Sequence, residues 1–103
     1  MSVLMEFSMF PLEGSGSKSA YVAKIVKLIQ ESGYSYKLTP MSTVVETETM
    51  HEALKLLEYS YVQLDECERV YACVKFDIRQ GRSDGMHQKI DSIQAKIDTP
   101  IHT

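Results

Sequence analysis

Hydrophobic and polar residues alternate along residues 69–79, and this alternation predicts a two-faced β-strand. The even positions from Val70 to Ile78 are all apolar, whereas the odd positions carry aromatic, thiol or charged side chains. Successive side chains of a strand point to opposite faces of a sheet, so one face can enter a core while the other stays polar. Residues 2–10 alternate in the same way, with Val3, Met5 and Phe7 on the face that we expect to be buried.

The remaining patterns predict three helices and two further short strands. Apolar residues recur at helical spacing in the helical segments, while β-branched residues and alternation mark the strands. Thr47 or Thr49 is the expected cap of the second helix. In chain order, the further expected elements are a loop at 11–17, a helix at about 19–33, strands at 34–39 and 42–48, helices at about 50–66 and 85–98, and a frayed tail at 99–103.

This order is βαββαβ with an added C-terminal helix, which predicts an α+β fold of the ferredoxin-like type. Such a sandwich has a four-stranded antiparallel sheet with helices on one face. Right-handed crossovers would put the first and last strands side by side, and we expect both at the centre of the sheet. The length of 103 residues indicates a single domain spanning residues 1–103.

Charge and composition exclude several classes of partner. A net charge of −3 gives no basic footprint for nucleic acid. No apolar run reaches the roughly 20 residues that span a bilayer, and the N-terminus lacks the pattern of a signal peptide, so we expect a cytoplasmic protein without a membrane partner. Cys67 and Cys73 are expected to be reduced structural thiols, and no spacing of cysteine or histidine indicates a metal site.

Two groups of charged residues are candidates for chemistry. Glu46 and Glu48 are two apart on a predicted strand, so they share a face. Both could contact a ligand or form a solvated strand edge. A further alternative is a small enzyme that uses Glu46 and Asp77 as acid and base. Arg79 and Arg82 flank Gly81, and Lys89 follows, a basic set that could hold a phosphate or the carboxylates of another subunit.

The chain resembles the small thiamine-binding proteins of ferredoxin-like fold, long catalogued as uncharacterised conserved proteins. The resemblance extends from Val3 to Ile97, and the order and spacing of several short motifs carry it. These are residues 7–11 (FSMFP), 21–23 (YVA), 32–33 (SG) with Tyr36, 40–43 (PMST), 46–48 (ETE), 69–70 (RV), 78–79 (IR), and the series Arg82, Met86, Lys89 and Ser92. The family pattern usually reads Glu-Gly-Glu where this chain has Thr47 between its two glutamates.

The resemblance implies non-catalytic binding of thiamine or its hydroxymethylpyrimidine moiety, with no cofactor. It also implies a homotetramer built as a dimer of dimers, with the ligand near subunit interfaces. Carried over by position, the ligand-binding candidates are Ser8, Thr43 and Glu46, with Tyr36 stacking on the ligand and Arg79 as a structural or ligand-side cation. The alternative is a structural or regulatory homo-oligomer without a small-molecule ligand.

Overall fold

Four antiparallel strands form one sheet in the order β2-β3-β1-β4. The computed structural model describes residues 1–12 and 18–103, so most of the predicted loop at 11–17 lies outside the described residues. The elements are β1 (Ser2–Pro11), α1 (Lys18–Ser32), β2 (Ser35–Leu38), β3 (Thr43–Thr47), α2 (Met50–Val62), β4 (Val70–Arg79) and α3 (Gly85–Gln94). The predicted ferredoxin-like βαββαβ arrangement with a C-terminal helix is confirmed.

The first and last strands are neighbours, as predicted, but the prediction that both lie at the centre of the sheet is wrong. β4 is an edge strand, and β1 and β3 are the two central strands. The hairpin that joins β2 to β3 returns β3 alongside β1 in antiparallel register, with Phe7 opposite Thr43. Because that side of β1 is then occupied, β4 can pair only with its outer side.

The predicted parity of the two long strands is confirmed by their register and burial. Val3, Met5, Phe7 and Met9 are all buried in the core. Directly opposite residues of an antiparallel pair lie on the same face of the sheet. Val74 faces Phe7, and Phe76 faces Met5, so the apolar residues of β4 share the face of the core.

Burial of that face nevertheless stops before the edge of the sheet. Phe76 and Ile78 belong to the apolar face that is expected to enter the core, but they remain 37% and 49% exposed, so this expectation is wrong for the outer part of β4 in the single chain. α1 and α2 contact β1, and α2 also contacts β3, which leaves the outer strand β4 without comparable helical cover among the described residues.

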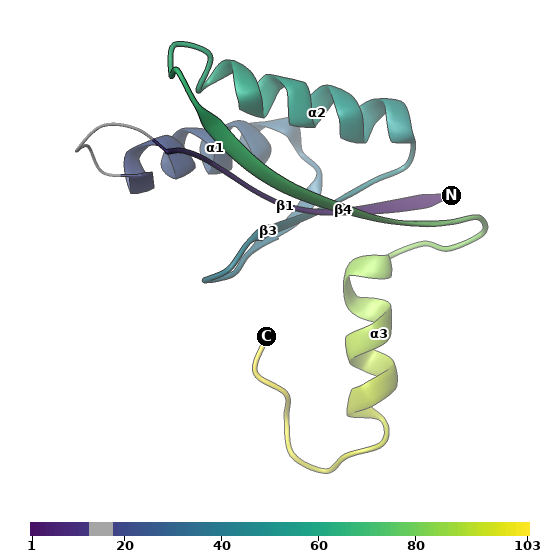
Figure 1. Cartoon of the computed structure of the whole chain (residues 1–103). Coiled ribbons are helices and arrows are strands. Elements are labelled where there is room, and N and C mark those ends of the chain that lie inside the picture. The colour runs from purple at the N-terminus through teal and green to yellow at the C-terminus, as the bar shows by residue number, and fades with distance from the viewer. Residues whose placement is uncertain (13–17) are drawn as a thin grey trace.

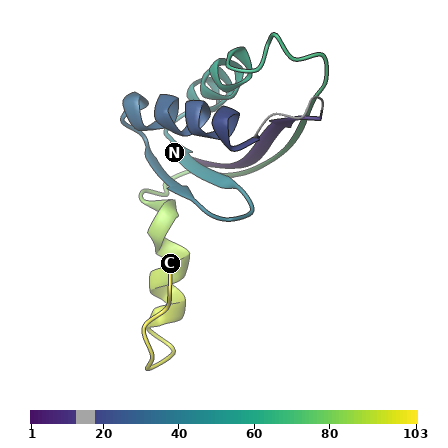
Figure 2. The same ribbon diagram turned by 90° about the vertical axis from the view of Figure 1, so that its left-hand side faces the viewer.

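The third helix lies on the opposite side of the sheet from α1 and α2. Figures 1 and 2 show α1 and α2 layered over one face, while α3 and the C-terminal tail project from the other. We call this second face the open face; α3 contacts it at β1 and β3. On this face Leu4 lies opposite Asp77, and Ser8 lies opposite Cys73.

The helix boundaries differ from the prediction mainly at their C-terminal ends. α2 ends at Val62 rather than near residue 66, and α3 ends at Gln94 rather than near residue 98. The predicted cap of α2 is confirmed at Thr49, whose hydroxyl accepts a hydrogen bond from the backbone N–H of Glu52. Short hydrogen-bonded turns continue past both helices, for example from Cys67 N–H to Leu64 O, which explains why helical spacing extends beyond the regular helix.

Candidate functional site

A cavity of about 410 Å³ opens where β1 extends beyond its neighbour β3. The pairing of β1 with β3 ends at Phe7 and Thr43, whereas β1 continues to Pro11 beside β4. The edge of β1 after Phe7 therefore has no strand partner on this side among the described residues. We call this space the hairpin cavity; it is lined by residues 7–10 of β1, Val22 and Ile25 of α1, and residues 38–43 of the β2–β3 hairpin.

The free strand edge explains why both faces of β1 contribute to the hairpin cavity. Phe7 and Met9 belong to the core face, whereas Ser8 and Phe10 belong to the open face. Backbone groups of a strand bond alternately to its two neighbours. Leu12 N–H bonds to Arg69 O on the β4 side, so this alternation directs the N–H and C=O of Met9 towards the cavity edge. The cavity wall thus combines apolar side chains with polar backbone.

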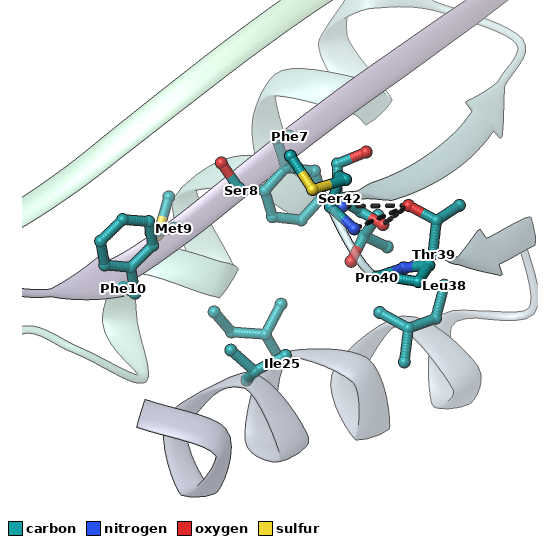
Figure 3. A pocket seen from close by; sticks show the side chains of 12 residues that line it. Phe7, Ser8, Met9, Phe10, Ile25, Leu38, Thr39, Pro40 and Ser42 are labelled. Atoms are coloured by element: carbon teal, nitrogen blue, oxygen red, sulfur yellow. Dashed lines mark hydrogen bonds between the residues drawn. The ribbon is translucent and has the colours of Figure 1, made fainter. Parts of the chain in front are cut away.

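The hairpin wall is held in shape by one threonine. The Thr39 hydroxyl accepts hydrogen bonds from the N–H groups of Met41 and Ser42, at 3.2 and 3.0 Å, and donates to Ser42 O. Thr39 N–H also bonds to Ser42 O at 2.9 Å. Pro40 fixes one backbone angle within this turn. Figure 3 shows these bonds, with Ile25 pointing from α1 towards the space between β1 and the hairpin.

The rim of the hairpin cavity carries an aromatic ring and a cation. Phe10 lies 5.8 Å from the Tyr71 ring, measured between centroids, and the Lys18 ammonium lies 4.9 Å from the centroid of Phe10. Among the residues that line the cavity, the polar side chains are hydroxyls, and none is a carboxylate. A cavity of this size with apolar walls and a few hydroxyl and backbone groups suits a flat, neutral heterocycle.

Two of the five predicted site residues, Ser8 and Thr43, line the hairpin cavity. Tyr36 lies on the core side of β2, opposite Val45, and its hydroxyl accepts a hydrogen bond of 2.8 Å from the Gln30 amide. Glu46 and Arg79 lie on the open face, near α3. The single chain therefore brings Ser8 and Thr43 together and leaves the other three elsewhere.

Glu46 binds the N-terminus of α3. Its carboxylate accepts hydrogen bonds from the backbone N–H of Gly85 at 2.8 Å and of Met86 at 3.0 Å, and from the Ser2 hydroxyl. Burial alone would raise the pKa of Glu46, but the bonds from Ser2, Met86 and Gly85 outweigh it, so its pKa lies below the ordinary value. The carboxylate takes the place of a side-chain cap, because Asp84 makes no capping bond.

A buried arginine supports this arrangement. The Arg82 side chain is only 7% exposed, and it donates to the Asp77 carboxylate at 3.0 Å, to Asp77 O, and to both the hydroxyl and carbonyl of Ser2. A Cβ added at Gly85 would lie 2.6 Å from Arg82 Nε, so position 85 has no room for a side chain while Arg82 keeps this place. Arg82 and Gly85 together position the N–H groups that reach Glu46.

Glu46 and Glu48 line a separate, acidic hollow, although β3 ends at Thr47 and the predicted strand face does not extend to Glu48. Glu46, Glu48 and Glu52 line a space of about 820 Å³ beside Tyr34. The Tyr34 hydroxyl donates to Glu52 at 2.8 Å, and this bond lowers the pKa of Glu52 and raises the pKa of Tyr34. Glu46 and Asp77 are both engaged, by α3 and by Arg82, which does not favour their predicted alternative role as an acid–base pair.

Sequence reasoning missed the roles of Thr39, Arg82 and Gly85. Thr39 precedes Pro40 in a tight connection, and a hydroxyl before such a turn is a recognisable signal for side-chain bonding to the turn backbone. Arg82 and Gly85 gave no comparable local signal, because their partners Ser2 and Glu46 are distant in sequence. Among the described residues, no group of three or more histidine, cysteine or acidic side chains could hold a metal ion.

Comparison with known proteins relates this fold to one family. Residues 5–94 match the model of a family described as thiamine-binding protein. A UPF0045 protein of Methanothermobacter thermautotrophicus is 28% identical over 98 residues, covering 92% of this chain and 99% of its own length. A UPF0045 protein of Mycobacterium bovis is 29% identical over 101 residues, covering 97% of this chain and 99% of its own length.

Solved structures agree with these matches. A hypothetical protein of Methanocaldococcus jannascii superposes with a TM-score of 0.78 at 27% identity, covering 89% of this chain and 95% of its own. A Thermotoga maritima protein, provisionally described as a thiamine biosynthesis or salvage protein, has a TM-score of 0.76 at 17% identity, covering 90% of this chain and 99% of its own. At 17% identity, the likeness to the Thermotoga maritima protein shows the fold alone.

In the described part of the chain, no helix has the length and apolarity needed to cross a membrane.

Proposed function

Because the chain belongs to the thiamine-binding protein family, we propose that it binds thiamine or the hydroxymethylpyrimidine moiety of thiamine, without catalysis, in the cytoplasm. The observation that carries the proposal is the hairpin cavity, with its apolar walls and the hydroxyls of Ser8 and Thr43. The aminopyrimidine is flat and offers both donors and acceptors, which match hydroxyls and a free strand edge. The cavity volume of about 410 Å³ lies within the range of roughly 300–1,000 Å³ that is typical of small-molecule pockets.

The pyrimidine, rather than the thiazolium, occupies the hairpin cavity in this proposal. A thiazolium cation needs a carboxylate or an open aromatic face nearby. The cavity lining holds no carboxylate, and the nearby Glu6 carboxylate is paired with Lys75 and accepts a hydrogen bond from Ser42. Lys18 already lies over Phe10 at the rim. Thiamine therefore enters with its pyrimidine inside and its cationic ring towards solvent or a second subunit. Contacts of Tyr36, Glu46 and Arg79 with the ligand stay predictions. A second copy of the chain would have to bring these residues to the cationic end of thiamine, outside the hairpin cavity.

Assembly into a homotetramer is part of the proposal, and the edge strand β4 supports it. β4 pairs with β1 along one edge only, and its other edge is ten residues long with no strand partner among the described residues. Phe76 and Ile78 beside this edge are partly exposed, as are Leu54 and Tyr61 of α2. Long, apolar, unpaired edges are normally covered or paired. We propose that two copies pair edge to edge through β4 and that two such dimers assemble into the tetramer.

Titration calorimetry with thiamine and with hydroxymethylpyrimidine tests the proposed function. We expect saturable binding of both, weakened about tenfold in Ser8→Ala and in Thr43→Val, because each loses one hydrogen-bonding group. Thr43→Ser, which keeps the hydroxyl, and Ser83→Ala, outside the cavity, serve as controls and should bind like the natural chain. No heat with either ligand from an intact oligomer would support the alternative of a structural or regulatory oligomer.

A further inference from the structure

A second concave site lies between α3 and the open face of the sheet. It has a volume of about 570 Å³, and we call it the α3 groove. The residues from α3 are spaced three and four apart, so one face of the helix forms one wall. The other wall comes from the ends of β1 and β4 and the connection after β4. Its polar lining residues are Asp77, Arg79, Arg82, Gln88, Lys89 and Ser92.

The α3 groove has an excess of positive charge in a chain whose net charge is −3. Arg82 donates hydrogen bonds to Asp77 and Ser2 and is therefore not available to a ligand. Its ion pair with Asp77 also neutralises the one carboxylate in the groove. Arg79 and Lys89 are exposed, and neither is paired with a carboxylate among the described residues. Two unpaired cations therefore line one groove from opposite walls, one on β4 and one on α3.

We propose that the α3 groove binds a phosphoryl group. A phosphate monoester carries a charge of about −1.5 to −2 near neutral pH. Two cations balance this charge more closely than they balance the single negative charge of a carboxylate. The Arg79 guanidinium can donate two parallel hydrogen bonds to phosphate oxygens, and Lys89 adds a point charge. The Gln88 amide and the Ser92 hydroxyl lie on the same helix wall as further donors.

This site is separate from the hairpin cavity, and although Gly85 lines it, it does not use the N–H groups at the N-terminus of α3. The hairpin cavity lies at the Phe7–Phe10 end of β1, whereas the groove is lined by Leu4, near its other end. The first N–H groups of α3 are already bonded to Glu46. Recognition in the groove therefore depends on side chains of Arg79 and Lys89, and the proposal does not require that thiamine binds elsewhere.

Calorimetric titration at low ionic strength with inorganic phosphate, and separately with phenyl phosphate, tests the proposal on the full chain. We expect saturable binding with one site per chain, weakened about tenfold in Arg79→Gln and in Lys89→Gln, since each removes a charge-assisted contact. Lys96→Gln is the matched control, because Lys96 is exposed, lies outside the groove and carries the same charge. Tighter binding of phenyl phosphate would indicate an ester as the ligand, and equal binding would indicate free phosphate.

Three results would overturn the proposal. One is the absence of saturable binding by the natural chain, and another is an equal loss in Lys96→Gln, which would indicate nonspecific charge attraction. The third is a fall in the sedimenting mass of Arg79→Gln or Lys89→Gln, which would mean that another copy's carboxylates fill the groove. Thiamine titrated into Lys89→Gln should bind unchanged, so failure of the phosphoryl site and failure of the proposed function give different results.

Discussion

Glu46 on β3 accepts a hydrogen bond from the backbone N–H of Gly85, the first residue of α3. The two residues are 39 positions apart in the sequence, and a second bond from Met86 N–H reaches the same carboxylate. A carboxylate at this position satisfies backbone donors that a helix leaves unpaired and complements the positive end of its dipole. Glu46 therefore acts as the anchor of α3 on the open face.

Replacing Glu46 by Gln should loosen the start of α3. The amide keeps the shape but turns one acceptor into a donor facing N–H groups, and we expect a local cost of about 1–2 kcal/mol, as for loss of a helix cap. Hydrogen exchange should speed up at Gly85 and Met86 and stay unchanged in α2. Binding to the hairpin cavity should survive. Unchanged protection at the start of α3 would show that other contacts hold the helix.

The anchor should also fail in acid. The pKa of Glu46 is lowered in the folded chain, because bonds from Ser2, Met86 and Gly85 outweigh the opposing effect of burial. A lowered pKa means that the stabilisation is fully present above the unfolded value of about 4.3 and is lost as pH falls below it through the folded pKa. The amide shift of Gly85 should follow this titration in NMR spectra. In Glu46→Gln the shift should be flat over the same range; an identical pH response would assign the transition to another group.

The alternation of residues predicted which face of β1 is buried, because side-chain parity is a local property of a strand. The same alternation placed Phe76 correctly on the core face, but it could not show that the helices stop short of β4. The position of β4 depends on where the β2–β3 hairpin lies, and the anchor at Glu46 depends on a helix 39 residues away. These are tertiary contacts, and local patterns carry no information on them.

Phe7 and Phe76 provide a test of this difference between the centre and the edge of the sheet. Phe7 is 2% exposed, so Phe7→Ala should cost about 3–5 kcal/mol in the free energy of unfolding. Phe76 is 37% exposed in the single chain, so Phe76→Ala should cost only about 1–2 kcal/mol at low protein concentration. Denaturant unfolding of dilute samples measures both. Equal costs would mean that the apolar side of β4 is buried to the same extent as the core.

The unpaired edge of β4 can be blocked without breaking its pairing with β1. Leu12 N–H bonds to Arg69 O, so odd residues at this end of β4 face β1, and the N–H of even residues such as Ala72 points outward. Proline there removes an outward donor and is tolerated on an edge strand. We expect Ala72→Pro to stay folded but to halve the sedimenting mass, whereas Ala72→Ser should keep the natural mass. If Ala72→Pro keeps the natural sedimenting mass, the subunit contact does not run through the edge of β4.

The central claim, that the hairpin cavity binds the pyrimidine, is tested most directly by following backbone amide signals in NMR spectra while hydroxymethylpyrimidine is added. We predict saturable shifts at residues 7–10 and 39–43, with Met9 among the largest because its N–H faces the cavity edge. Glu46 and α3 should shift little. Saturable shifts confined to the open face around Glu46, Arg79 and α3, with residues 7–10 unmoved, would contradict the account.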